Sequence, residues 1–325
     1  MHLSLLIKST CSFIANQNIP CSLAMASQMH VHRRMLHLAK ILLPIDFSAR
    51  SKIAAQEAGV LARRLRSEVT LLHVNNDVSP TRATALGARA GSSASSAPID
   101  ERTAAALAEL NTFAIKELEG IPVKRLMSSG DPAWVIVEYA QTEHVDLIFM
   151  PTRGSGPFRQ FLLGSITAKV LHDAESPVWT GAHLEKQGVF DPTQVSHVIC
   201  AVDFGLQSAK ALHWAADYAA EFGAKLTVVH AVFPTVLPER YTFQWHEEAH
   251  TEARDRLNAL LSHAGVRADV LVVRGDASKA LCRAIQQKEA ALLVIGRRAV
   301  SGKHGRLGSD AYGIICHSPC PVVSI

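Results

Sequence analysis

The chain has 325 residues, of which 48% are hydrophobic and 19% charged, with a formal net charge of +4 at neutral pH. Since a typical domain has roughly 150 residues, this length suggests about two domains. The lysines and arginines are scattered, which gives no support for a nucleic-acid interface, and no apolar run approaches the ~18 residues that span a bilayer. We therefore expect two buried cores and binding to neither nucleic acid nor membrane.

Residues 1–34 differ from everything that follows them. The apolar stretch at 3–7 is too short for the hydrophobic region of a signal peptide, and no lysine or arginine precedes it. We expect a disordered extension or a start codon assigned too early, with a signal peptide as the alternative.

From residue 40 onward, apolar runs alternate with helical stretches. Gly120 followed by Pro122 predicts the end of the second helix, and Asp131-Pro132 predicts the start of the third. Residues 75–100 are rich in Ser, Ala, Gly and Thr without an apolar period, which predicts a flexible loop. The first half predicts strands at 40–45, 69–74, 123–127, 146–150 and 177–180, and helices at 49–66, 101–119, 132–143 and 165–173.

The second half of the chain repeats the first. Asp203 follows Asp46 by 157 residues, and His230 follows His73 by the same 157. Later landmarks recur as Gly130-Asp131 with Gly275-Asp276, Gly164-Ser165 with Gly308-Ser309, and Ser176-Pro177-Val178 with Cys320-Pro321-Val322. The predicted strands of this half are 197–202, 226–230, 269–273, 291–295 and 321–325. We expect two homologous domains at 38–181 and 196–325, joined by a linker at 182–195.

The alternation of strands and helices predicts an α/β fold with a doubly wound parallel sheet in each domain, because each parallel crossover needs a helix. Such sheets bind ligands at the carboxyl ends of their strands. Asp46 and Asp203 end the first strands, and a glycine-containing segment follows each fourth strand. Both features are expected at the edge where a ligand would bind.

The segment after the fourth strand of the first domain has the composition of a phosphate-binding loop. Gly154 would let the backbone approach a ligand closely, and Arg153 adds positive charge. Gly164 and Ser165 open a helix whose free N–H groups and positive dipole end suit a phosphate. Ser165 is equally well explained as a helix N-cap, so the spacing alone leaves both interpretations open.

Taken together, these motifs resemble the universal stress protein family, whose signature is Gly, two residues, Gly, nine residues, then Gly-Ser or Gly-Thr. Gly154, nine residues and Gly164-Ser165 match its last two parts. The resemblance covers about residues 39–325 in two copies. It implies five-stranded parallel sheets of the adenine nucleotide alpha hydrolase-like type, related by a pseudo-two-fold axis, and binding of ATP or AMP. The site residues it implies are Pro44, Ile45, Asp46, Val74, Met150, Arg153, Gly154, Gly164, Ser165 and Ile166.

Each half also departs from this signature. Pro151 replaces the first glycine, which fixes φ and removes a backbone donor. In the second half Ala299 replaces the second glycine, and Asp310 places a carboxylate beside the expected phosphate position, where it would repel an anion. We therefore expect an adenine nucleotide in at least one domain, in the first in preference to the second, with no metal beyond nucleotide-associated Mg.

Two further patterns have a structural and a chemical interpretation. His246-Glu247-Glu248-Ala249-His250 matches H-E-x-x-H, the pattern of zinc peptidases, but it lacks a third ligand and has no counterpart in the first half. We interpret it as coincidence on a half-solvated helix. Asp46 is a candidate general base, yet no paired carboxylate or Ser-His-Asp array accompanies it, so hydrogen bonding is the simpler role.

The six cysteines show no disulfide spacing, and Cys200 and Cys282 fall within predicted core elements, which is typical of reduced thiols in a cytoplasmic protein. The run Cys316-His317-Ser318-Pro319-Cys320 offers three potential metal ligands, but Cys320 is expected to enter a buried strand. We therefore predict structural thiols.

The last predicted strand of each half, 177–180 and 321–325, is an apolar edge that an isolated domain would leave open. The resemblance implies that such edges pair, so we expect these two strands to join the domains within the chain and to bury Trp179 and Ile325. The protein partners are unknown.

We expect a nucleotide-responsive binding protein that is not an enzyme. The alternatives are a scaffold with degenerate sites and a weak ATP hydrolase. A metallopeptidase is disfavoured because the sequence lacks the full set of metal ligands and catalytic residues that such an enzyme needs.

Overall fold

The computed structural model of the chain describes residues 36–76, 101–151, 163–181, 190–232, 239–299, 305–306 and 309–325. The expectations for residues 1–34, for the loop after Asn76, for most of the linker, and for Arg153 and Gly154 lie outside the described residues.

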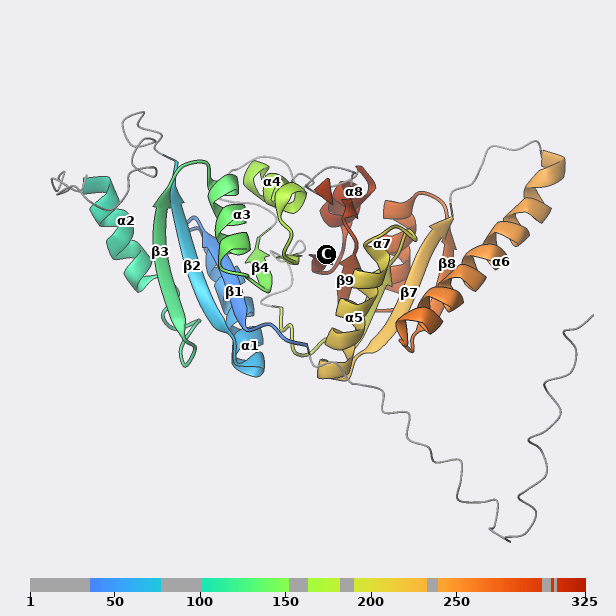
Figure 1. Ribbon diagram of the computed structural model, residues 1–325, viewed down its shortest axis with the longest axis horizontal. Coiled ribbons are helices and arrows are strands. Elements are labelled where there is room, and N and C mark those ends of the chain that lie inside the picture. The colour runs from blue at the N-terminus through green and yellow to red at the C-terminus, as the bar shows by residue number, and fades with distance from the viewer. Residues whose placement is uncertain are drawn as a thin grey trace, which may run out of the picture. The chain divides into compact units, whose positions relative to one another are not determined.

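The first domain forms five parallel strands in the order β3-β2-β1-β4-β5, and the first four can be followed in Figure 1. The predicted α/β class is confirmed in this half. Its elements are β1 (Lys40–Ile45), α1 (Ala49–Leu65), β2 (Glu68–Asn75), α2 (Glu101–Thr112), β3 (Val123–Ser129), α3 (Pro132–Thr142), β4 (Leu147–Met150), α4 (Ser165–Asp173) and β5 (Val178–Thr180).

The second domain repeats this arrangement with the strand order β8-β7-β6-β9-β12, again all parallel. A two-stranded antiparallel ribbon of β10 and β11 is added, which the sequence did not predict. The elements are β6 (His197–Ala201), α5 (Ser208–Phe222), β7 (Lys225–Val232), α6 (Glu239–Ala264), β8 (Asp269–Arg274), α7 (Ala277–Gln287), β9 (Leu292–Ile295), β10 (Arg298–Ala299), β11 (Gly305–Arg306), α8 (Ser309–His317) and β12 (Val322–Ser324).

The strands are buried on both faces because helices cover both sides of the sheets, and this explains their uninterrupted apolar runs. One core cluster combines strand residues with residues of α1, α2, α5 and α6. The other combines strand residues with residues of α3, α4, α7 and α8. Helices α1, α2, α5 and α6 therefore cover one face of the strands, and α3, α4, α7 and α8 cover the other.

Strands β5 and β12 are antiparallel neighbours, with Trp179 opposite Val323. The hydroxyl of Thr180 donates to the carbonyl of Val322 at 3.1 Å. Trp179 is fully buried, as predicted, and its ring stacks on Phe149 with 5.2 Å between the ring centroids. The prediction that Ile325 is buried is wrong in degree: it is only partly buried, because it follows the last residue of β12.

A buried arginine adds to this region. Arg297, which follows β9, is 4% exposed, and its guanidinium donates to three backbone carbonyls around the end of α4. The accepting oxygens belong to Leu171 at 3.3 Å, Ala174 at 2.6 Å and Ser176 at 2.7 Å. Carbonyls in the last turn of a helix have no partner within the helix and carry partial negative charge, so a cation near the end of α4 is well placed to satisfy them.

Two helix boundaries differ from the prediction. The second helix ends at Thr112 rather than near residue 119, because Ala114 takes a left-handed backbone conformation with φ of 53°. The guanidinium of Arg125 accordingly satisfies the carbonyls of Leu110 and Phe113. In α4 the N-cap is Gly164, so the interpretation of Ser165 as N-cap is wrong.

The starts of α3 and α7 agree with the prediction. Asp131 accepts hydrogen bonds from the N–H groups of Ala133 and Trp134, and Pro132 is the first helical residue. Asp276 caps α7 in the same way. The preceding Gly130 and its counterpart in the second domain have φ of 136° and 117°, a conformation that favours glycine.

Candidate functional site

In the first domain, the described part of the predicted site lies along the carboxyl ends of three strands. Pro44 and Ile45 end β1, Val74 lies near the end of β2, and Met150 ends β4. Strand β1 pairs with both β2 and β4, so these ends are neighbours at one edge of the sheet. Asp46 follows directly after β1. This is the edge at which doubly wound sheets bind ligands.

The carboxylate of Asp46 is held by the start of α1. Its Oδ1 accepts a hydrogen bond from the Ser51 hydroxyl at 2.6 Å and one from the Ser48 N–H at 3.1 Å. In the second domain, Oδ1 of Asp203 accepts from the Gly205 N–H at 2.8 Å and from the Ser208 hydroxyl at 3.1 Å. Both carboxylates are therefore fixed acceptors, which agrees with the simpler of the two roles considered for Asp46.

A strained residue follows each of these aspartates. Phe47 and Phe204 have φ of 60° and 59°, in the left-handed region that a bulky side chain rarely adopts. Each ring packs against a histidine, His73 at 4.3 Å and His230 at 4.4 Å between ring centroids. Strained backbone of this kind persists where the surrounding structure holds it, most often at functional sites.

The two histidines are functional candidates that sequence reasoning did not select, although their shared spacing of 157 residues pointed to them. Nδ1 of His73 lies 3.0 Å from the carbonyl oxygen of Ile45, and Nδ1 of His230 lies 2.8 Å from that of Val202. Since a carbonyl only accepts, Nδ1 carries the proton in both rings. Each histidine thereby ties the second strand of its domain to the end of the first.

Helix α4 begins next to this edge. The Thr167 hydroxyl in its first turn donates to the carbonyl of Pro151, the residue after β4, at 3.1 Å. The N-cap Gly164 provides no side-chain hydrogen bond to the free N–H groups of the helix. Ile166, in the first turn, is 40% exposed. The N-terminal end of α4 thus has the features of an anion site: backbone donors, the positive end of a dipole and no competing side-chain cap.

In the second domain, the structure describes a cavity of about 370 Å³ at the corresponding edge. Its lining includes Ala201, Val202, Asp203, Ala231, Ile295 and Asp310. By the repeat, these are the counterparts of Pro44, Ile45, Asp46, Val74, Met150 and Ile166 in the first domain. Six positions predicted for one domain thus surround a cavity in the other. His230, Gly296, two valines of β7 and further residues of α7 and α8 complete the described lining.

A sequence model of the universal stress protein family matches residues 37–180 and again residues 195–325. The chain belongs to the universal stress protein family. It carries two such domains in tandem, as the duplicated motifs predicted. The similarity to solved structures shows the same fold. A universal stress protein from Archaeoglobus fulgidus aligns over 89% of this chain and 97% of its own, with a TM-score of 0.64 and 21% identity.

Two relatives of known sequence have about the length of one domain. Universal stress protein MJ0531 of Methanocaldococcus jannaschii is 34% identical over 139 residues, which are 43% of this chain and 79% of that protein. Universal stress protein MJ0577 of the same organism is 30% identical over 149 residues, 43% of this chain and 91% of that protein. Each match spans less than half of this tandem universal stress protein.

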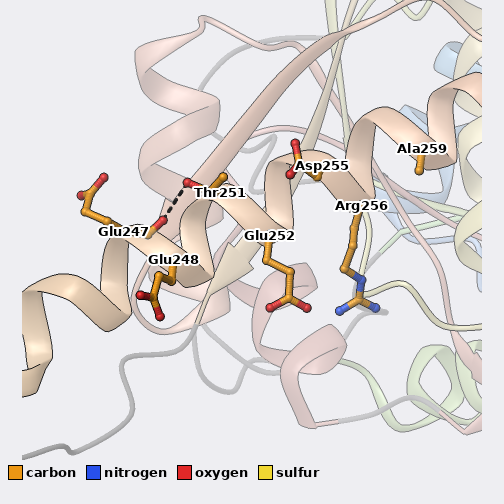
Figure 2. Close-up of a pocket in the computed structure, with 7 residues that line it drawn as sticks. All are labelled: Glu247, Glu248, Thr251, Glu252, Asp255, Arg256 and Ala259. Carbon is orange, nitrogen blue, oxygen red and sulfur yellow. Dashed lines mark hydrogen bonds between the residues drawn. The ribbon is translucent and has the colours of Figure 1, made fainter.

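The H-E-x-x-H segment lies on α6, which carries an acidic surface. Figure 2 shows Glu247 and Asp255 on one side of the helix and Glu248, Glu252 and Arg256 on the other. Glu247 accepts from Arg274 at 2.8 Å, and Arg256 lies over the Phe204 ring at 4.1 Å. Among the described residues, no three His, Cys, Asp or Glu side chains are grouped to hold a metal ion.

The described cysteines are free thiols: Cys200, Cys282, Cys316 and Cys320. Burial raises the pKa of the Cys200 and Cys320 thiols to about 12, so both are protonated at neutral pH. Cys320 is buried, as predicted, but it precedes β12 instead of entering the strand. A protonated, buried thiol is neither a nucleophile nor a metal ligand. In the ranges that the structure describes, no helix has the length and apolar character needed to cross a membrane.

Proposed function

We propose that this protein is a cytoplasmic regulatory protein that binds an adenine nucleotide, ATP or AMP, in its first domain and is not an efficient enzyme. The proposed domains are residues 38–181 and 196–325, with a linker at 182–195. Nucleotide occupancy would alter the loop regions 75–100 and 151–164 and thereby the surface offered to protein partners. Any Mg would arrive with the nucleotide.

The observation that carries this proposal is the start of α4. Gly164 leaves the first N–H groups of the helix without a side-chain acceptor, and Thr167 holds this turn next to the end of β4. A phosphate bound there would accept from those N–H groups and be favoured by the dipole. In this proposal Asp46, whose carboxylate Ser51 holds at the end of β1, would accept from the base or ribose of the same ligand.

The cavity of the second domain supports the location. The six lining residues named above are counterparts of residues proposed for the first domain, so the fold leaves space for a ligand at this edge. The proposed set in the first domain remains Pro44, Ile45, Asp46, Val74, Met150, Arg153, Gly154, Gly164, Ser165 and Ile166.

The pairing of β5 with β12 supports a second part of the proposal, that the two domains form an intramolecular pseudo-two-fold dimer. Each strand would otherwise leave an open, apolar edge, which promotes association with other chains. The free thiols of the described residues support a reducing compartment, hence a cytoplasmic location.

A scaffold that has lost nucleotide binding is the competing function, and Pro151 favours it. Proline at this position removes the backbone donor that the signature glycine would supply. Titration calorimetry of the full chain with ATP separates the two functions: we expect a saturable heat that Gly164→Val and Asp46→Ala abolish and that Gly308→Val, the matched change in the second domain, leaves intact. Absence of heat together with a melting temperature unchanged by millimolar ATP would support the scaffold instead. ATP turnover at enzyme-like rates that Asp46→Ala abolishes would support a hydrolase.

A further inference from the structure

The cavity of the second domain has the size of a small-molecule site and an apolar body. Its volume of about 370 Å³ falls in the range of roughly 300–1,000 Å³ typical of ligand pockets. Strand β7 supplies Val229 and Val232, and β9 supplies Ile295. The helices supply Leu281 from α7 and Ile314 from α8. These side chains form aliphatic walls on which a flat ring system would pack.

The polar side chains that line this cavity are hydrogen-bond acceptors. They are Asp203, His230 and Asp310, and the described lining contains neither lysine nor arginine. Asp203 is fixed by Gly205 and Ser208 and is acceptor-only when ionised. His230 places its proton on Nδ1, toward the carbonyl of Val202, so Nε2 of the neutral ring is an acceptor as well. A ligand that fits these groups must bring hydrogen-bond donors.

Asp310 makes the second domain differ from the first at the place where a phosphate would bind. It lies in the first turn of α8, whereas the corresponding residue of α4 is Ile166. A carboxylate at a helix N-terminus already uses the positive end of the dipole. It also repels a second anion: two like charges about 6 Å apart at a protein surface repel by enough to weaken binding roughly a hundredfold, less with salt screening.

We propose that the cavity of the second domain binds an unphosphorylated, nucleoside-type ligand, and that Asp310 is the residue that rejects the phosphorylated form. The aliphatic walls accept the planar base, and the ribose hydroxyls or the base amino group donate to Asp203, His230 and Asp310. Together with the nucleotide site proposed for the first domain, this site would give the chain two ligand sites of opposite preference. This inference concerns the second domain and holds whether or not the first domain binds ATP.

The test measures binding of adenosine and of AMP by calorimetry on the full chain carrying Gly164→Val, so that the proposed site of the first domain is closed. We expect adenosine to bind at one site and AMP to bind at least tenfold more weakly. Asp310→Asn preserves the side-chain shape and removes its charge, so it should bring the AMP affinity to within about threefold of the adenosine affinity. Because Asp310 is exposed, this variant is expected to fold normally.

Two cavity variants establish the location. Ala311→Phe fills the cavity from α8 and should abolish adenosine binding. Ala277→Leu narrows the cavity from α7 and should weaken adenosine binding. The second variant replaces the first if circular dichroism shows that Ala311→Phe does not fold. Adenosine binding that neither folded cavity variant changes contradicts the proposal. The proposal is also contradicted if AMP binds as tightly as adenosine or if adenosine does not bind. It is contradicted as well if Asp310→Asn leaves the ratio of the adenosine and AMP affinities unchanged. ATP binding to the chain with an intact Gly164 is a separate readout and tests only the first domain.

Discussion

Glu57 is expected to make the stability of the protein depend on pH. It is 1% exposed on the inner side of α1, and its Oε1 accepts a hydrogen bond from the N–H of Phe190, in the segment before the second domain, at 3.2 Å. Burial raises the pKa of this carboxyl from 4.5 to about 7, and the hydrogen bond from Phe190 lowers it by less. The folded state therefore holds a proton that the unfolded chain releases at a lower pH.

The sign and size of the effect follow from this difference. Between about pH 4.5 and pH 7 the folded chain binds more protons than the unfolded chain at this site, so the free energy of unfolding falls as the pH rises. A difference of about 2.5 pKa units at 1.36 kcal/mol each corresponds to a loss of about 3 kcal/mol by pH 8. Glu57→Gln keeps an oxygen acceptor for Phe190 and cannot ionise, so it should not show this loss.

The assay is urea unfolding of the wild type and of Glu57→Gln at pH 5, 6, 7 and 8. We expect the variant to gain about 2.5 kcal/mol relative to the wild type between pH 5 and pH 8, because a small part of the loss has already occurred at pH 5. Glu138→Gln, at an exposed position of α3, is the matched control and should shift the difference by no more than about 0.5 kcal/mol. A Glu57→Gln difference that is the same at pH 5 and pH 8 would refute the reasoning.

Two further predictions concern buried groups. Arg297→Met should lower the free energy of unfolding, measured by urea denaturation, by roughly 3–5 kcal/mol, because three carbonyls lose a buried charged donor. Arg63→Met is the control: it removes an exposed donor to two carbonyls and should lower the free energy of unfolding by less than about 1 kcal/mol. Equal losses in the two variants would contradict the role of Arg297. Iodoacetamide at pH 8 should leave Cys200 and Cys320 unmodified in the folded protein and alkylate both in urea, as peptide mass spectrometry would show, since burial raises the pKa of each thiol to about 12. Rapid alkylation of Cys320 without denaturant would count against its burial.

Most of the fold could be predicted because the strands are buried on both faces. Residues 41–45 and Leu147–Met150 form uninterrupted apolar runs, which are typical of parallel strands that are covered by helices on both faces. Because the sequence is duplicated, the strands and helices could be predicted twice, once in each half, and the two predictions could be compared. The start of α3 was predictable for a local reason, since the Asp131 carboxylate accepts from N–H groups two and three residues later and Pro132 fixes the backbone at the first helical position.

The boundaries that failed depend on contacts that are distant in sequence. Helix α2 stops at Thr112 because Phe113 turns toward Phe47, with 5.7 Å between the ring centroids, and Arg125 satisfies the released carbonyls. Neither contact leaves a mark in the local sequence, whereas Gly120 and Pro122 gave a clear but later stop signal.

The candidate site was predictable in position but not in shape. Strand ends and a helix start follow from topology, so Asp46 and its counterpart Asp203 were identified from spacing alone. The cavity in the second domain depends on side-chain volume: Ala201 and Ala231 stand where the first domain has Pro44 and Val74, and the smaller side chains leave more room. The volume of a cavity depends on side chains from several strands and helices, so it cannot be predicted until the positions of those elements are known.

The central claim is that the tandem chain binds an adenine nucleotide in its first domain alone. Native mass spectrometry of the gently purified full chain, with ATP added at increasing concentration, tests it most directly. We predict a single added ATP per chain that saturates at one and disappears in Gly164→Val. A chain that stays free of nucleotide at millimolar ATP, or that binds two, would contradict the account.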